Sequence, residues 1–551
     1  MPNLIRSVAC AISGGVDSAV SAYLLKKNGF DVVGVFMTNW DPLNEGMSCS
    51  LSSDRDDAKL VCERLDIPFH ELNFVREYWI YVFQPLLRCY EYGSTPNPDV
   101  LCNRFIKFNL LTAKLLRLSK CAGVTKHAVD NTIRVDALAT GHYCQSSFGN
   151  FLQYRSDKEP HLLRGTDFVK DQTFWLSTIS HRHLRHFMFP IGGLLKPTVK
   201  KIAADIGLQA IAARRESMGM CFIGKRRFSD FIESYLTPKV GLFKEFLTGI
   251  VLDEHRGMWH AYSPLTSTVP TVDLTVVAVK ETTYMHPPAG LQRLCRLHVS
   301  SQAFRTFQKY DTNLRERRLP VSLQAYEPPP LQQYCHSRRF RSTRLMNSVY
   351  SNYVFTTTLL GQRANITRAN GPFYIAQMDF HTQDIYVVRD PYHPCLFMRK
   401  CWTAPAVWIN SSPPNLPSND IQFQWQNKWR SVTCKVEPHD NLVEAARSVH
   451  PCIDKKLSVP VGDHLLQTMD TDCEADRCVG PCLSITLDEP MRCIASGQWA
   501  ALYAENRCLG GAMICGSVSL WDEGRESPYT EWDYAHYELD YNTANTKSVI
   551  N

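Results

Sequence analysis

The chain has 551 residues, a formal net charge of +6 at pH 7 and 44% hydrophobic residues, which is the composition of an ordinary globular protein. Its length suffices for about three or four domains. No apolar run approaches the roughly 18 residues that span a bilayer, so we predict no transmembrane helix. Twenty cysteines without regular spacing or a signal peptide argue against a disulfide framework and favour a reducing compartment.

The positive charge comes from one segment. Met258–Asn352 holds 12 Lys and Arg against 5 Asp and Glu, a net of +7, which leaves the rest of the chain at −1. Nucleic-acid binding must therefore be judged from local patches and not from the net charge.

The first predicted element is a strand over the apolar run Val8–Ile12, followed by a turn at Ser13–Gly15 and a helix from Val16. Two glycines let the backbone approach a bound group closely, and the free N–H groups of a first helical turn favour an anion. We predict that a phosphate binds here, with Asp17 placed for Mg²⁺ and with Ser13 and Ser18 adding hydroxyl donors. The alternative is a turn that only closes a βα unit; no GK[ST] follows, so this is not a Walker loop.

Further strands and helices alternate along the chain. Asp31–Met37 and Ile67–Phe74 read as strands, and Asp54–Leu65 reads as a helix between them. This order predicts an α/β fold with a doubly wound parallel sheet, covered on both faces, and a nucleotide at the carboxyl ends of its strands. Val135–Tyr143 reads as another buried strand that ends in Gly-His-Tyr, where His142 faces either a ligand or the core.

Gly93–Phe108 predicts an extended turn and then a helix, with Asp99 as its N-cap. Cys102 would lie near the helix N-terminus beside Arg104 and Lys107, an environment that lowers the pKa of a thiol. A buried apolar cysteine is the alternative.

Two later stretches carry polar or basic residues. Lys170–Thr173 predicts the start of a helix over 171–180, and Lys196–Arg227 is locally basic. Within the second, Glu216–Gly224 places Cys221 in a glycine-flanked loop, so phosphate-backbone contacts could surround a reactive thiol. A solvated charged face is the alternative.

Several motifs in order resemble the tRNA-specific 2-thiouridylases, in particular the eukaryotic mitochondrial type. The resemblance covers most of Val8–Leu236 and resumes after Tyr353. The motifs are SGGVDS, FMTNWD, TPNPDVLCNRFIKF, ATGHY, KDQTFWL and GMCFIGKRRFSDF, then TTTLLGQRANI and, near the end, SGQWAALYAENRCLGGAMI.

The resemblance implies a fold of the adenine nucleotide alpha hydrolase type with a pyrophosphatase loop, followed by small β-domains that include a C-terminal β-barrel. GPFYIAQMDFHTQDIYVV reads as a hairpin in the central domain. The expected parts are a catalytic domain over 1–213, a central β-rich domain over 214–257 and 353–400, a basic insert over 258–352, the barrel over 401–521 and a polar tail over 522–551.

Two segments depart from the family pattern. Phe423–Thr433 lies where a more basic strand with a histidine is expected, which weakens the case for tRNA contacts there. Met258–Asn352 has no counterpart in the family, and its apolar residues follow neither a helical nor a strand period over any length. We interpret it as a disordered or loosely folded loop, or as translated intron.

The resemblance also implies a reaction. ATP would adenylate the C2 oxygen of the wobble uridine of a tRNA, with Mg²⁺ bound at Asp17, and sulfur from a cysteine persulfide would replace that oxygen. Cys221 would carry the persulfide, Cys102 would attack it and form a disulfide with Cys221, and Asp99 would act as general acid or base.

The resemblance also implies which residues bind ATP and tRNA. Those for ATP are Ala11, Ser13, Gly14, Gly15, Asp17, Ser18, Met37 and Gly141. Those for tRNA are Asn97, Lys107, His142, Lys170, Asp171, Gln172, Arg214, Lys225, Gln362 and Arg363.

The expected partners are tRNA and a persulfide-carrying sulfur donor, with no membrane and a monomeric state. The resemblance implies the mitochondrion, although Met1–Ser7 is shorter than an ordinary transit peptide. Two other functions stay open: an ATP-pyrophosphatase ligase acting on a small molecule, and an RNA-binding homologue that has lost catalysis.

Overall fold

The computed structural model describes residues 5–40, 50–91, 93–116, 133–214, 228–257, 363–364, 366, 369, 371–379, 381–427, 429–449 and 480–526. The chain forms one compact unit from Met1–Thr266 and Asn352–Asn551, and a second from Ser267–Ser351. All described residues belong to the first unit. The whole of the predicted insert, and the predicted tail beyond residue 526, lie outside the described residues.

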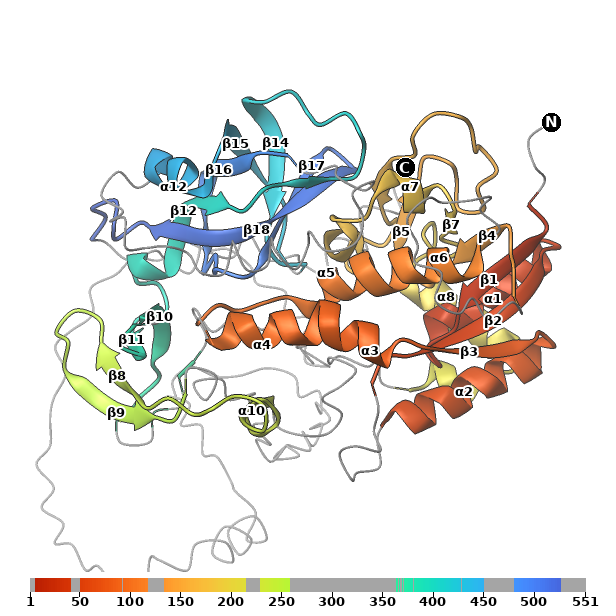
Figure 1. The fold of residues 1–551 in the computed structure, drawn as a ribbon, viewed down its shortest axis with the longest axis horizontal. Coiled ribbons are helices and arrows are strands. Elements are labelled where there is room, and N and C mark those ends of the chain that lie inside the picture. The colour runs from red at the N-terminus through yellow and green to blue at the C-terminus, as the bar shows by residue number, and fades with distance from the viewer. Residues whose placement is uncertain are drawn as a thin grey trace, which may run out of the picture. The chain divides into compact units, whose positions relative to one another are not determined.

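The first part of the chain forms a five-stranded parallel sheet in the order β3-β2-β1-β4-β7 (Figure 1). The order reverses at β1, so the carboxyl ends of β1 and β4 flank the position where such folds bind ligands. The predicted doubly wound parallel sheet is confirmed. Its strands are β1 (Ser7–Ala11), β2 (Asp31–Thr38), β3 (Phe69–Asn73), β4 (Ala137–Ala139) and β7 (Phe187–Met188).

Helices cover both faces of this sheet because the strand side chains alternate. Val8, Cys10 and Ile12 share one buried cluster with α1, α2, α8 and α9, whereas Ala9 and Ala11 pack in another with the helices of the opposite face. The first set is α1 (Val16–Lys27), α2 (Ser50–Leu65), α8 (Lys196–Asp205) and α9 (Gln209–Ala212). The second set is α3 (Val75–Tyr78), α4 (Gln84–Glu91), α5 (Pro98–Leu101), α6 (Leu111–Leu115) and the π-helical segments η2 (Trp79–Phe83) and η3 (Cys102–Leu110).

A small sheet follows in the order β10-β11-β8-β9. β10 pairs antiparallel with β11, which confirms the predicted hairpin, and β11 pairs in parallel with β8. This sheet joins two stretches that lie far apart in the sequence: β8 (Gly241–Glu245) and β9 (Val251–His255) with β10 (Tyr374–Asp379) and β11 (Asp384–Val388). The short helix α10 (Phe228–Glu233) precedes it.

The last part forms a nine-stranded sheet in which β12 pairs with both β16 and β18 and so closes a barrel, as predicted. The hairpin β5–β6, which precedes β7 in the sequence, joins this sheet through β18, so the barrel and the catalytic part share strands. The strands are β5 (Cys144–Ser146), β6 (Leu162–Arg164), β12 (Phe397–Thr403), β13 (Val407–Trp408), β14 (Ser418–Gln424), β15 (Val432–His439), β16 (Cys482–Arg492), β17 (Trp499–Ala504) and β18 (Arg507–Ser519).

The domain limits therefore differ in detail from the expected ones. β12 begins at Phe397, so the barrel takes in the end of the segment expected in the central domain. Two short helices, α7 (His181–Leu184) and α12 (Leu442–Val449), complete the described elements together with the 3₁₀ turns η4 (Thr173–Leu176) and η6 (Pro394–Leu396). Within the ranges described, no helix has the length and apolar character needed to cross a membrane.

The packing of α2 on β2 depends on the missing side chain of Gly34. A Cβ at this position would collide with Sγ of Cys62, which is 1% exposed. We expect Gly34→Ala to lower the free energy of unfolding by about 1–3 kcal/mol. Adding Cys62→Ala should recover most of that loss, because the colliding sulfur is gone.

Denaturant titrations of the two single variants and the double variant test this coupling. Losses that simply add in the double variant would contradict the packing of Cys62 over Gly34.

Candidate active site

The loop between β1 and α1 has the backbone conformation that the glycines predict. Gly14 has a φ of +78°, and a Cβ there would collide with the carbonyl oxygen of Asp54 at the start of α2. Gly15 is the N-cap of α1, and no side chain bonds to the N–H groups of the first turn there. The positive end of α1 is thus left uncapped by a side chain, which suits an anion.

The two loop serines brace the turn. The Ser13 N–H donates to Ser18 Oγ at 3.1 Å, and the Ser18 hydroxyl donates to the Gly15 carbonyl at 2.9 Å. The hydroxyl oxygens of Ser13 and Ser18 lie 3.3 Å apart. Ser18 therefore holds the shape of the loop, and its predicted role as a donor to a ligand stays a prediction.

Asp17, in the first turn of α1, has both carboxylate oxygens bonded to Lys196. The Lys196 ammonium donates to Oδ1 at 2.8 Å and to Oδ2 at 2.7 Å, and the Tyr143 hydroxyl donates to Oδ1 at 2.8 Å. Lys196 is only 7% exposed. Although it belongs to the basic stretch predicted to hold tRNA phosphates, its ammonium faces the β1–α1 loop.

The other predicted ATP residues lie around the same loop. Ala11 and Met37 lie near the carboxyl ends of the neighbouring strands β1 and β2. Gly141 follows β4, and a Cβ there would come within 2.7 Å of the Ser18 backbone nitrogen. The structure thus brings the residues predicted for ATP to one edge of the sheet. Within the described ranges, no three His, Cys, Asp or Glu side chains gather as a metal site.

The helix that carries Asp99 and Cys102 starts earlier than predicted. Asn97 is the N-cap, without a capping hydrogen bond from its side chain, and Pro98 follows it, so Asp99 lies inside the first turn. Proline is favoured at the first helical position because its missing N–H has no partner there, and this moves the cap to Asn97. From Cys102 the helix winds as a π-helix, a form that often marks functional sites.

Lys107 links Asp99 to His142 electrostatically. Desolvation of the Asp99 carboxyl raises its pKa above the ordinary value, and the positive charge of Lys107 opposes this rise. Burial, followed by Lys107, lowers the pKa of His142 to about 3, so the imidazole is neutral at pH 7. Its Nδ1 lies 2.9 Å from the Thr140 hydroxyl. Cys102 is buried at 6% exposure, and the roles assigned to these residues stay predictions.

The side chains of Asp171 and Gln172 form hydrogen bonds with other groups of the protein. Asp171 accepts hydrogen bonds from the Gly165 N–H at 2.8 Å and the Thr173 hydroxyl at 2.6 Å, and Gln172 accepts from the Tyr143 N–H at 2.9 Å. The helix predicted over 171–180 is only a 3₁₀ turn, because these side-chain bonds fix the backbone locally. Lys170, half-buried, lies beside them.

The barrel supplies residues that contact Asp171 and Thr173 and that sequence reasoning missed. We call this set of contacts, beside the glycine loop, the wall. The Arg164 guanidinium donates to Asp171 and to Gln424 of β14, both at 3.1 Å, and lies 3.6 Å from the ring centre of Tyr503 on β17. The Tyr503 hydroxyl is 3.2 Å from that of Thr173. No local signal could have found these contacts, since Arg164 and Gln424 are 260 positions apart.

The remaining predicted tRNA residues are dispersed. Arg214 forms an ion pair with Asp57, and Arg363 is exposed and forms a β-bridge with Tyr374. Cys221, Lys225 and Gln362 lie outside the described residues. In the divergent segment 423–433, Trp425 and Trp429 are buried in the barrel core at 2% and 3% exposure.

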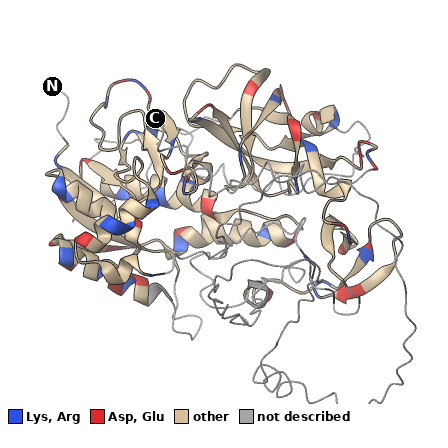
Figure 2. Cartoon of the chain, turned by 180° about the vertical axis from the view of Figure 1, so that it is seen from behind, with Lys and Arg blue, Asp and Glu red and all other residues tan. Residues whose placement is uncertain are grey.

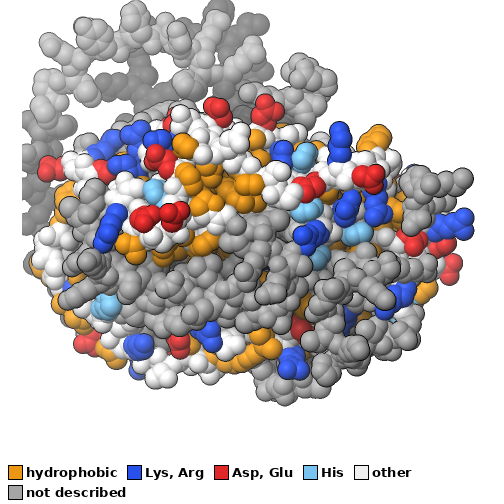
Figure 3. Space-filling model, turned by 45° about the horizontal axis from the view of Figure 1, so that its top comes forward, with side chains coloured by type: hydrophobic (Ala, Val, Ile, Leu, Met, Phe, Trp, Pro, Cys, Tyr) orange, Lys and Arg blue, Asp and Glu red, His pale blue; other side chains and the backbone are white. Residues whose placement is uncertain are grey.

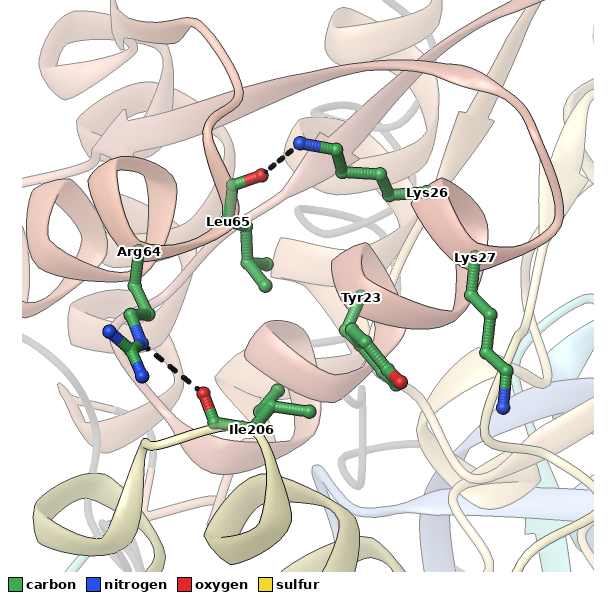
Figure 4. A pocket seen from close by; sticks show the side chains of 6 residues that line it. All are labelled: Tyr23, Lys26, Lys27, Arg64, Leu65 and Ile206. Atoms are coloured by element: carbon green, nitrogen blue, oxygen red, sulfur yellow. Dashed lines mark hydrogen bonds between the residues drawn. The ribbon is translucent and has the colours of Figure 1, made fainter.

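A hollow of about 480 Å³ lies at the other end of α1 from the glycine loop (Figure 4). Two of its cations form hydrogen bonds: the Lys26 ammonium donates to the Leu65 carbonyl at 2.5 Å, and Arg64 Nε donates to the Ile206 carbonyl at 3.3 Å. Tyr23 and Lys27 complete the lining. These contacts tie α1, α2 and α8 together, and the hollow is separate from the glycine loop.

Among the described residues, the charges drawn in Figures 2 and 3 do not mark one path for a nucleic acid. Lys and Arg recur on the helices around the parallel sheet (Figure 2). On the face drawn in Figure 3, basic side chains are interspersed with acidic ones and with histidines. A tRNA contact is therefore argued from individual residues.

Comparison with known proteins decides the family. A mitochondrial tRNA-specific 2-thiouridylase 1 of Drosophila melanogaster is 46% identical over 94% of this chain and 96% of its own length. The chain belongs to the mitochondrial tRNA-specific 2-thiouridylase family. Further members with this name, from Danio rerio and Homo sapiens, are 32% and 30% identical, each over 93% of this chain and over 92% and 90% of their own lengths.

Two parts of this 2-thiouridylase family chain also match domain families. Residues 6–225 match "tRNA methyl transferase HUP domain", and residues 467–514 match "Aminomethyltransferase beta-barrel domain". Among solved structures, a 4-thiouridine synthetase–RNA complex with bound ATP is similar over 42% of this chain and 49% of that one. At 14% identity and a TM-score of 0.23, that similarity supports no argument about ligands.

The two loop glycines should respond differently to substitution. Gly14→Ala forces a side chain into a positive φ and against the Asp54 carbonyl, so we expect a loss of about 1–3 kcal/mol in the free energy of unfolding. Gly15→Ala meets only Ser13 Oγ at 3.4 Å and should stay within about 0.5 kcal/mol of the wild type.

Denaturant unfolding of the full chain measures both losses. Equal losses in the two variants would contradict the loop conformation.

His142 should make the protein less stable in acid. The pKa of the His142 imidazole is about 3 in the folded chain, whereas in the unfolded chain the imidazole takes up a proton near pH 6.5. Acid therefore favours the unfolded chain. Stability should therefore fall by about 1.4 kcal/mol per pH unit from pH 6.5 towards pH 3 on account of this residue.

We expect His142→Gln to flatten the pH dependence of unfolding in that window. Identical slopes for the wild type and His142→Gln would show that His142 is not held neutral.

Proposed function

We propose that this chain is a mitochondrial, ATP-dependent tRNA sulfurtransferase that replaces the C2 oxygen of the wobble uridine with sulfur. Membership of the 2-thiouridylase family supports tRNA thiolation and the mitochondrial location. The observation that carries the chemical part is the uncapped N-terminus of α1 behind the positive-φ Gly14, at the edge of the sheet that a nucleotide would occupy.

ATP is needed because a carbonyl oxygen of uracil is a poor leaving group. In the proposed first step the C2 oxygen attacks the α-phosphorus of ATP, the bond to the β-phosphate oxygen breaks, and pyrophosphate leaves. The N–H groups at the start of α1 would bind the phosphates. Bound Mg²⁺ would offset the charge on the pyrophosphate, with Asp17 as its ligand from the protein.

Sulfur transfer would use Cys102 and Cys221. A donor protein would load Cys221 with a persulfide, whose terminal sulfur attacks C2 and displaces AMP. The Cys102 thiolate then attacks Sγ of Cys221, the sulfur–sulfur bond breaks, and 2-thiouridine is released. A Cys102–Cys221 disulfide remains, and an external reductant must open it. Because Cys102 is buried, the surrounding chain would have to move for the two thiols to meet.

Eight other cysteines of the described ranges are poor candidates for this chemistry. Burial raises the pKa of their thiols, so they stay protonated at neutral pH and are weak nucleophiles. They are Cys10, Cys62, Cys89, Cys144, Cys395, Cys401, Cys434 and Cys508.

Asp99 is the proposed general acid or base. Desolvation raises its pKa, which brings it closer to the working pH of an enzyme. The target uridine would leave its stack in the anticodon loop to reach it.

The tRNA contacts are proposed in two groups. Direct contacts are assigned to Asn97, Lys107, His142, Lys170, Arg214, Lys225, Gln362 and Arg363. Asp171 and Gln172 have an indirect role in this proposal, because their side chains bond to Gly165, Thr173 and Tyr143 within the protein.

The test is sulfur incorporation into tRNA by the purified chain with ATP, Mg²⁺ and a persulfide donor. We expect thiolated tRNA from the wild type and none from Cys102→Ser or Cys221→Ser. Cys89→Ala removes a buried thiol of α4 and should keep the activity.

Thiolation by either serine variant would overturn the assigned sulfur chemistry. A wild type that makes no thiolated tRNA, yet releases pyrophosphate with a small-molecule acceptor, would overturn the proposed function.

A further inference from the structure

Phe168 is an exposed aromatic side chain in the loop that follows β6. Its exposed fraction is 59%, although a phenylalanine is most often found in a protein core. Single exposed apolar residues are common on protein surfaces, so exposure alone assigns no role. The meaning of this one depends on how its loop is held and on what lies beside it.

The backbone on both sides of Phe168 is fixed by a buried carboxylate. Asp167 is 9% exposed, and its Oδ1 accepts hydrogen bonds from the backbone N–H groups of Val169 at 3.1 Å and Lys170 at 3.2 Å. Its Oδ2 accepts from the backbone N–H of Lys196 at 2.9 Å, and the ammonium of Lys196 faces the glycine loop. The ring is therefore presented on a stiff turn, so little conformational entropy is lost when a ligand contacts it.

The loop that carries Phe168 is attached beside β4. Gln172, at its end, accepts a hydrogen bond from the N–H of Tyr143 at 2.9 Å, and Tyr143 follows β4. The sheet places β1 between β4 and β2, and Met37, which is predicted to bind ATP, lies on β2. The loop thus lies on the opposite side of β1 from Met37, which favours a ligand other than the adenine of ATP.

We propose that Phe168 is a stacking platform for a nucleobase of the tRNA anticodon loop, next to the target uridine. This inference rests on the proposed function. The bases of single-stranded RNA loops unstack readily and stack on aromatic side chains of proteins. Lys170, two residues further on, is predicted to contact tRNA as well, so the ring and the ammonium would bind base and phosphate of one strand.

Stacking on Phe168 would also favour the conformation that the reaction needs. The target uridine has to leave its stack before its C2 oxygen can react, and this costs free energy. A neighbouring base that rests on the ring of Phe168 is no longer available to stack on the uridine. The contact therefore adds affinity and keeps the uridine turned out of the loop.

Substitutions at Phe168 separate stacking from general apolar contact. We expect Phe168→Ala to bind an unmodified tRNA transcript about tenfold more weakly than the wild type. Phe168→Tyr keeps an aromatic ring and should bind like the wild type, whereas Phe168→Leu keeps apolar bulk without a π-face and should bind nearly as weakly as Phe168→Ala. The slope of log K against log salt should stay the same in all three, because no charge changes.

Tyr154→Ala is the matched control. Tyr154 is also an exposed aromatic residue, at 70%, but its loop packs through Phe151 on Phe30, which directly precedes β2. That position is at the amino ends of the strands, at the opposite edge of the sheet from the glycine loop. We expect Tyr154→Ala to leave tRNA affinity unchanged. ATP affinity should be unchanged in Phe168→Ala, which separates a tRNA base from the adenine of ATP.

Abasic tRNAs identify the base that stacks. One abasic nucleotide is placed on either side of the wobble uridine in turn, and each tRNA is titrated with the full-length wild type and with Phe168→Ala. At one of the two positions, we expect loss of the base to weaken binding by the wild type about tenfold and binding by Phe168→Ala hardly at all, because the contact is already missing.

Four results decide the matter. Wild-type affinity for tRNA in Phe168→Ala or Phe168→Leu would overturn the inference, and so would losses that simply add at both abasic positions. Weakened ATP binding in Phe168→Ala would assign the ring to adenine and overturn it too. A wild-type chain with no affinity for tRNA would overturn the proposed function itself.

Discussion

The site depends on how the carboxylate of Asp17 is held at the start of α1. Lys196 from α8 and Tyr143 from the segment between β4 and β5 both donate to it, so three separate parts of the chain meet at one side chain. Gly14 and Gly141 make this approach possible, because a side chain at either position would strike the neighbouring backbone. The glycine loop is thus shaped by tertiary packing as well as by its own sequence.

The wall beside this loop is shared between the catalytic sheet and the barrel. Gln172 holds the backbone of Tyr143, while Asp171 is tied through Arg164 to Tyr503 of β17. A continuous set of contacts therefore runs from the barrel to the residue that orients Asp17. Any tRNA bound along both parts would meet a surface whose two halves are locked together, which helps to explain why the β5–β6 hairpin joins the barrel sheet.

Local sequence was sufficient where the local pattern decides the conformation. The apolar run at Val8–Ile12, the positive φ of Gly14 and the alternation in the β10–β11 hairpin all follow from period and turn chemistry. The N-cap at Asn97 was missed because a proline at the first helical position shifted the boundary. Lys196 was expected among basic residues that hold tRNA phosphates. Its burial and its ion pair with Asp17 depend on packing between distant segments, which the local sequence does not show.

The most direct test of the account is the stoichiometry of the thiolation reaction. With ATP, Mg²⁺, tRNA and a persulfide donor, AMP, pyrophosphate and 2-thiouridine can be quantified in the same sample. The account predicts one AMP and one pyrophosphate for each 2-thiouridine formed, because the C2 oxygen must be adenylated before sulfur can replace it. Thiolation without ATP, or with ADP and phosphate as products, would contradict it.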